Sequence, residues 1–152
     1  MSIEARLKEL GLELPPAPKA IGVYKSVITT GNLVMTSGHG PLQSDGTLIT
    51  GVVGVDADQE AGYAASKQAG LAILATLKEH LGSLDKIKRV IKLTGFVACT
   101  ADFDQQPAVI NGCSELFRDV FGPDIGVGAR SAVGMVALPV KMMVEIEGIF
   151  EI

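Results

Sequence analysis

Residues 126–151 read GVGARSAVGMVALPVKMMVEIEGIFE, and this stretch decides the fold. Its first part, residues 131–138, is mostly apolar and stops at Pro139, which predicts a strand. In its second part apolar and polar residues alternate, which predicts a half-buried strand with one polar face. The apolar set is Met142, Val144, Ile146 and Phe150, and the other set is Met143, Glu145, Glu147 and Glu151. The chain therefore closes with two strands in succession.

Two helices and three further strands are predicted upstream of this stretch. Residues 107–121 have a clean helical period, and residues 58–81 form a longer helix that is apolar on most sides. Asp56 and Gln59 have the spacing of a capping box, and Gly82 occupies the place of a left-handed residue after the helix. Residues 26–30 and 33–37 flank a tight hairpin turn, and residues 87–98 fit a central strand.

The order of these elements predicts one α+β domain over residues 1–152, with the helices on one side of a sheet. Residues 1–14 add an N-terminal helix, predicted over 2–12 with Ser2 as its cap, before a connector that contains three prolines.

Composition restricts the class of protein. Of 152 residues, 47% are hydrophobic and 20% charged, with a mean hydropathy of +0.36, so part of the apolar excess is expected to cover a subunit interface. A net charge of −4 and a pI of 5.1 argue against a nucleic-acid partner. The longest apolar run, residues 69–77, is too short for a membrane span, and no signal peptide is recognisable. With two cysteines only, a cytoplasmic protein is expected.

Most familiar catalytic motifs are absent. His39 and His80 lie in no metal-binding pattern, so no metal site is expected. Ser37 and Ser131 lack the surroundings of a hydrolase nucleophile. The positive feature is Arg130, which stands between glycines and an apolar strand. Its guanidinium offers a planar fork to a ligand carboxylate, and the alternative is a structural ion pair, for example with Glu145.

Three blocks of sequence resemble one known family. The first is Ala17-Pro-x-x-Ile21-Gly22-x-Tyr24, followed by Gly31-Asn32-x-x-x-Thr36-Ser37-Gly38-x-x-Pro41. The second is Val90-x-Lys92-x-Thr94-x-Phe96-Val97 with Asp102-Phe103, and the third is Ala129-Arg130-Ser131-x-Val133, Leu138-Pro139 and Val144-Glu145-Ile146-Glu147. From residue 17 to the end the chain resembles the Rid (reactive intermediate deaminase, YjgF) family, whose members are often called endoribonuclease L-PSP-like.

The resemblance implies a chorismate-mutase-like fold with a mixed sheet, assembled as a homotrimer with ligand clefts between subunits. It implies hydrolysis of enamine or imine intermediates, of the 2-aminoacrylate type, to a 2-keto acid and ammonia without a cofactor. Arg130 would hold the substrate carboxylate, and Glu145 would orient or activate the water. Tyr24, the backbone of Ser37 and Gly38, Asn111 and the backbone of Ala132 would line the cleft.

The chain departs from the deaminase pattern at several positions. Gly128 stands where proline is usual, Ala132 where cysteine is usual, and Val23 where proline is usual. The connection over residues 103–111 is also longer. Each site residue keeps a structural alternative: Tyr24 as a cover on the hairpin, and Asn111 and Glu145 as solvated polar residues. A role for His39 in the cleft stays open.

Geometry raises one further question. If the last two strands formed a simple hairpin, Arg130 and Glu145 would lie ~13 Å apart along the strands. Either these strands are not neighbours, or another subunit completes the cleft. Three functions remain: an imine deaminase first, a noncatalytic trimeric binder of small carboxylates such as 2-keto acids second, and a ribonuclease third, because the chain is acidic.

Overall fold

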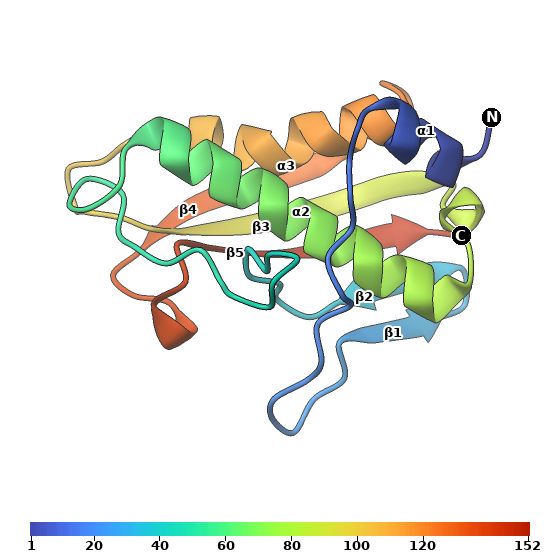
Figure 1. The fold of residues 1–152 in the computed structure, drawn as a ribbon, viewed down its shortest axis with the longest axis horizontal. Coiled ribbons are helices and arrows are strands. Elements are labelled where there is room, and N and C mark those ends of the chain that lie inside the picture. Colours follow the sequence, from blue (N-terminus) through green and yellow to red (C-terminus); the bar gives the residue numbers. More distant parts are fainter.

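A computed structural model describes all residues, 1–152, as one five-stranded mixed sheet with two long helices on one face (Figure 1). The strand order is β1-β2-β5-β3-β4. The helices are α1 (Ile3–Glu9), α2 (Gln59–Leu81) and α3 (Gln106–Phe121); the strands are β1 (Val27–Thr30), β2 (Leu33–Thr36), β3 (Arg89–Ala98), β4 (Ala129–Met135) and β5 (Val144–Glu151). Short 3₁₀ turns occupy Leu84–Lys86 and Pro139–Lys141. The predicted fold class is confirmed.

The last two strands are not neighbours. β5 lies between β2 and β3 and is antiparallel to both, whereas β4 pairs in parallel with the far side of β3 after the α3 crossover. The chain after β4 therefore passes β3 before it re-enters the sheet. The sequence left open whether the last two strands form a hairpin, and the structure shows that they do not.

The start of α2 differs from the prediction. The helix is capped by Asp58, whose Oδ1 accepts a hydrogen bond from the Ala61 backbone N–H at 2.8 Å. Asp56, the predicted capping residue, accepts instead from the Val52 N–H and closes the preceding loop. Two aspartates two residues apart can both cap a helix, and the turn of the loop decides which one does so. The helix ends as predicted, with Gly82 in the left-handed conformation at φ 81°.

The core lies between α2, α3 and the sheet. Phe117 of α3 meets Phe150 of β5 edge to face, with ring centroids 6.0 Å apart. The predicted alternation holds from Val144 onward, but Met143 is buried rather than exposed. The reason is that β5 begins only at Val144, so Met143 precedes the pleat and its N–H bonds to the Ile49 carbonyl instead.

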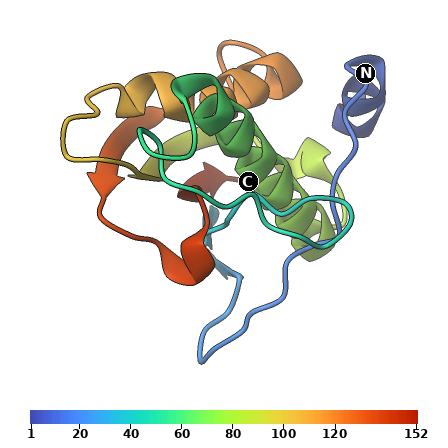
Figure 2. The same ribbon diagram turned by 60° about the vertical axis from the view of Figure 1, so that its left-hand side comes forward.

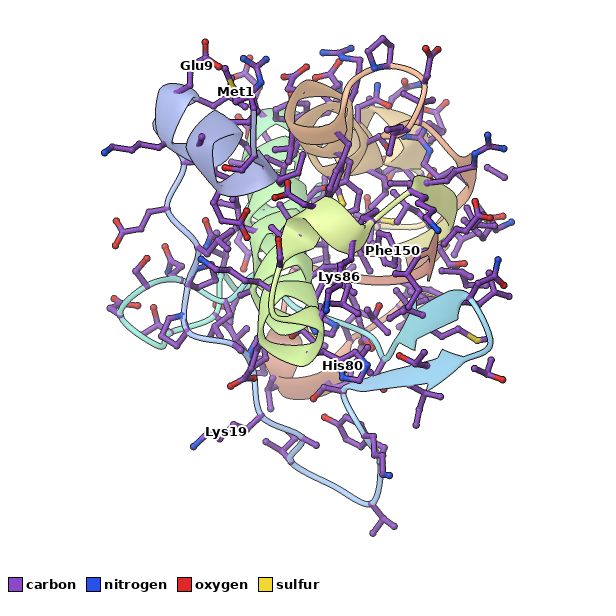
Figure 3. The ribbon with its side chains drawn as sticks, turned by 90° about the vertical axis from the view of Figure 1, so that its right-hand side faces the viewer. Met1, Glu9, Lys19, His80, Lys86 and Phe150 are labelled. Carbon is purple, nitrogen blue, oxygen red and sulfur yellow. The ribbon has the colours of Figure 1, made fainter.

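The N-terminal helix is shorter than predicted, Ile3–Glu9, and Ser2 caps it as expected. Figure 3 shows α1, between the labelled Met1 and Glu9, beside the helical layer and away from the β1–β2 hairpin. Arg6 donates from Nε to the Asp119 carbonyl at 2.9 Å, which ties α1 to the end of α3. The connector that follows ends in a loop that projects from the body of the molecule before β1 (Figures 1 and 2).

The second face of the sheet carries no helix. Pairing places Met35 of β2 opposite Ile149, and Val133 of β4 opposite Phe96, all on this open face. Large apolar side chains of the outer strands remain exposed there: Ile28, Met35, Val133 and Met135. An isolated chain would leave this apolar sheet surface in water.

Candidate functional site

Four of the predicted site residues surround one cavity. The cavity has a volume of about 550 Å³ and lies where the N-terminal connector, the end of β2 and the start of β5 meet. Tyr24, Ser37, Gly38 and Glu145 all line it, and we call it the Glu145 cavity. Tyr24 and Glu145 are 121 residues apart in the chain, and the fold brings them to one cavity.

Glu145 lies directly under the backbone of Gly38. A Cβ atom on Gly38 would overlap Glu145 Oε1, so only glycine leaves room for this carboxylate. Glu145 is half-buried, and burial raises the pKa of its carboxyl, with a smaller contribution from the negative charge of Glu147. A carboxyl group with a raised pKa is better suited to exchange protons with a bound water or substrate near neutral pH.

His39 supports the cavity from the core side. It is only 3% exposed, and both ring nitrogens are occupied: Nδ1 lies 2.7 Å from the Ser37 carbonyl and Nε2 lies 2.8 Å from Thr76 Oγ1 of α2. A carbonyl only accepts hydrogen bonds, so Nδ1 carries the proton and Nε2 accepts from the Thr76 hydroxyl. Burial lowers the pKa of His39, which keeps the ring neutral. His39 thus anchors the backbone that lines the cavity.

The mouth of the cavity is formed by the projecting loop. Tyr24 is half exposed, and its hydroxyl accepts a weak hydrogen bond from the Ile21 N–H at 3.3 Å. The Ser37 hydroxyl donates to the Lys25 carbonyl, and the Ser37 backbone N–H donates to the Ser26 carbonyl at 2.9 Å. The polar donors of Ser37 are therefore engaged within the chain, and the residue contributes to the wall of the cavity.

Arg130 lies in a second group of polar residues. Its Nη1 donates to Asn111 Oδ1 at 2.7 Å and to Ser114 Oγ at 3.1 Å, both from α3. No carboxylate lies within 4.0 Å of its guanidinium, so the alternative of an ion pair with Glu145 is not observed within the chain. Neutral partners thus fix one edge of the guanidinium and leave its positive charge unpaired. We call these three residues the Arg130 cluster.

Asn111 belongs to this cluster and not to the Glu145 cavity. Ser114 was missed by the sequence reasoning, although its spacing of three residues from Asn111 places both on one face of α3. Ala132 lies two residues after Arg130 on β4, opposite Gly95 of β3.

The two groups are separate within one chain. Arg130 pairs with Leu93 on the helix-covered face, whereas Glu145 pairs with Phe96 on the open face. Their Cα atoms are offset by three residues along β3 and by two strand spacings across the sheet. The two offsets are perpendicular and combine to a distance of about 14 Å. A small ligand cannot contact both side chains of the same chain.

Other features of the structure do not form a comparable site. Cavities of about 660 Å³ beside the loop before α2 and about 560 Å³ between α1 and α3 contain none of the predicted residues. No three His, Cys, Asp or Glu side chains gather where they could hold a metal ion. None of the helices has the length and apolar run that crossing a membrane requires.

Comparison with known proteins identifies the family. The model of the family described as "YjgF/chorismate_mutase-like, putative endoribonuclease" matches residues 4–147. The chain belongs to this family. Protein TCP17 of Trypanosoma cruzi is 35% identical over 150 residues, covering 99% of this chain and 94% of that protein. The 2-iminobutanoate/2-iminopropanoate deaminase of Escherichia coli K12 is 32% identical over 133 residues, covering 88% of this chain and 90% of the deaminase.

Among solved structures, Atu1372 from Agrobacterium tumefaciens, described as a protein with unknown function, is 45% identical with a TM-score of 0.90. That match covers 99% of this chain and 94% of the other. The structure explains why residue 128 is glycine in this chain, where the resemblance to the YjgF family predicts proline. A Cβ atom there would overlap the Val90 carbonyl oxygen, so the backbone at this point admits only glycine.

Proposed function

We propose that this chain hydrolyses reactive 2-imino acids, and their enamine tautomers, to 2-keto acids and ammonia. The observation that carries this proposal is the unpaired guanidinium of Arg130, held by Asn111 and Ser114 with no protein carboxylate near it. A fixed arginine with free donors is suited to bind the carboxylate of a small acid in a bidentate manner. Relatives named as 2-iminobutanoate/2-iminopropanoate deaminases support the same reaction class.

In the proposed reaction Glu145 orients a water molecule and accepts one of its protons. The water oxygen bonds to the carbon of the protonated imine (the iminium ion). The nitrogen then receives both water protons by way of Glu145, the carbon–nitrogen bond breaks, and the nitrogen leaves as ammonium, the protonated form of ammonia. The iminium carbon is already electrophilic, so holding the water and the substrate in contact supplies most of the required acceleration. Tyr24 and the backbone of Ser37 and Gly38 would contact the substrate from the other side of the Glu145 cavity.

The proposed site requires more than one copy of the chain. Arg130 and Glu145 lie on opposite faces about 14 Å apart, and the open face of the sheet leaves apolar side chains such as Met35 and Val133 exposed. We propose a homotrimer in which the Arg130 cluster of one copy faces the Glu145 cavity of the next. Light scattering should give about three times the 15.8 kDa of one chain, and a mass near 15.8 kDa would contradict the assembly.

The proposed function is tested by a coupled assay with a pyridoxal-phosphate serine/threonine dehydratase, which releases the unstable enamine. Addition of the protein should accelerate the appearance of the 2-keto acid, and Arg130→Ala should abolish the acceleration. Arg118→Ala is the matched control, because Arg118 is exposed on α3 and pairs with Asp119. Saturable binding of a 2-keto acid without acceleration would instead support the noncatalytic binder.

The net charge of −4 disfavours ribonuclease activity, because a ribonuclease surface must attract phosphates. We also propose a cytoplasmic location, which the two free cysteines, Cys99 and Cys113, support.

A further inference from the structure

The carboxylate of Glu115 lies one helical turn from the Arg130 cluster and does not pair with it. Asn111, which accepts from the guanidinium, and Glu115 are four residues apart on α3, so their Cβ atoms lie about 5–6 Å apart on one face of the helix. A glutamate at this spacing can reach the group that its neighbour binds. No carboxylate oxygen lies within 4.0 Å of Arg130, so Glu115 is held elsewhere.

Tyr63 of α2 is the residue that holds Glu115. The Tyr63 hydroxyl donates a hydrogen bond to Glu115 Oε2. This hydrogen bond raises the pKa of Tyr63, so the hydroxyl keeps its proton and remains a donor. Arg118 contributes little, because its Nη1 lies 4.0 Å from Glu115 Oε1 while its Nη2 pairs with Asp119 at 3.0 Å. The tyrosine hydroxyl is therefore the close partner of this carboxylate.

Close packing of α2 on α3 fixes the position of Tyr63. A Cβ atom on Gly112 would overlap the Tyr63 carbonyl oxygen, so the two helices meet backbone to backbone at this point. One turn further along α2, the Ser66 hydroxyl accepts from the Cys113 N–H at 3.1 Å and donates to the Ile110 carbonyl at 3.3 Å. A shift of either helix would break these contacts, so the tyrosine is held in place relative to α3.

From these contacts we infer that Tyr63 is a positioning residue for ligand binding: its hydroxyl holds Glu115 away from Arg130 and keeps the guanidinium free for the carboxylate of a ligand. This inference rests on the proposed function, in which Arg130 binds that carboxylate. Without the hydroxyl, rotation of the Glu115 side chain brings its own carboxylate to Arg130. The chain then occupies the planar fork that the ligand needs.

The size of the effect follows from the strength of a partly exposed ion pair. Pairs of this kind favour the paired state by about 1.5- to 5-fold. A ligand that binds only the unpaired state loses affinity in proportion to the fraction of chains in that state. Tyr63→Phe keeps the ring and removes only the donor, so it should raise the Kd for 2-oxobutanoate by about 2.5- to 6-fold.

Titration calorimetry with 2-oxobutanoate on four proteins tests the inference: the wild type, Tyr63→Phe, Glu115→Gln and the double variant. Glu115→Gln alone should change the Kd little, and in the double variant it should restore the wild-type Kd. Glu60→Gln in the Tyr63→Phe background is the matched control and should restore little, because Glu60 is exposed on α2 one turn before Tyr63. Circular dichroism and light scattering verify the fold and the assembly, and Tyr63→Leu replaces Tyr63→Phe if that variant fails to fold.

A second measurement needs no ligand. Urea denaturation of Arg130→Gln, Glu115→Gln and their combination gives the coupling between the two residues, once in the wild-type background and once in Tyr63→Phe. The coupling in the unfolding equilibrium constant should be close to one in the wild type and about 1.5- to 5-fold in Tyr63→Phe. A coupling that is no larger in Tyr63→Phe would overturn the inference.

The outcomes separate the two proposals. An unchanged Kd in Tyr63→Phe would overturn the inference and leave the proposed function standing. A weakened Kd that Glu115→Gln does not restore would also overturn it, because lost packing would then be the cause. A wild type that neither binds 2-oxobutanoate nor accelerates release of the keto acid would contradict the proposed function, and the urea measurement alone would then decide the inference.

Discussion

Replacement of Arg130 by alanine distinguishes a ligand-binding arginine from a structural one. In the structure Arg130 makes two hydrogen bonds, to Asn111 at 2.7 Å and to Ser114 at 3.1 Å, and it has no acidic partner. Both acceptors are half-buried and regain water when the guanidinium is removed, so each lost bond costs about 0.5–1 kcal/mol. The expected loss of stability is about 1–2 kcal/mol, or roughly 2–8 °C in Tm for a chain of this length.

The effect on ligand binding should be larger. Loss of a bidentate pair with a carboxylate removes ~1.5–3 kcal/mol of binding free energy, a factor of about 10–100 in Kd. Arg130→Lys should restore little of this, because an ammonium group cannot form the planar fork.

Calorimetric titration with a 2-keto acid and thermal melts on the same samples measure the two effects, with Arg118→Ala as the control for loss of one positive charge. A buried arginine that serves only structure would lose about 3–5 kcal/mol of stability instead. Unchanged affinity per folded molecule, together with a fall in Tm well above 10 °C, would refute the ligand-binding interpretation of Arg130.

Three further perturbations follow from the Glu145 cavity. Because burial raises the pKa of Glu145, the folded state favours the protonated carboxyl, and the stability of the wild type falls as the pH rises through that pKa. Glu145→Gln should therefore increase the free energy of unfolding at pH 7, by no more than about 1 kcal/mol for a half-exposed group, and Tm should rise accordingly. The gain should vanish below about pH 4. A constant gain at both pH values would contradict this cause. His39→Leu leaves the Ser37 carbonyl and the Thr76 hydroxyl without partners and should cost about 2 kcal/mol or more in urea denaturation, whereas His39→Asn keeps a donor and should cost less; equal costs would argue against the anchoring role. Gly38→Ala should abolish hydrolysis while Tm changes little, because the added methyl displaces only the Glu145 side chain; full activity would show that the carboxylate position is not critical.

The secondary structure follows closely from local patterns. The amphipathic period of residues 107–121 and the alternation after Val144 both come from burial on one face, which the sequence records directly. Ends of elements are decided by loop geometry, and this is why Asp58 rather than Asp56 caps α2, and why Met143 is buried.

The order of the strands could not be obtained in the same way. Alternation shows which face a residue such as Glu145 occupies within its own strand, but not which strand is inserted beside it. The position of β3 between β4 and β5 is set by long-range packing. The sequence indicates a separation of Arg130 from Glu145 only for an assumed hairpin, and the structure shows that the two residues also lie two strands apart and on opposite faces. Ser114 was missed for a related reason, because a serine on a half-buried helix face gives no signal until its partner is known.

The separation of Arg130 from Glu145 has a genetic consequence. Arg130→Ala and Glu145→Gln each remove one half of every proposed cleft, yet each variant keeps the half that the other lacks. When the two inactive proteins are unfolded and refolded together, random assembly places an intact Arg130 against an intact Glu145 in about a quarter of the clefts. Two alleles that are each null alone should therefore complement one another, and activity in the mixture should reach about a quarter of the wild-type level.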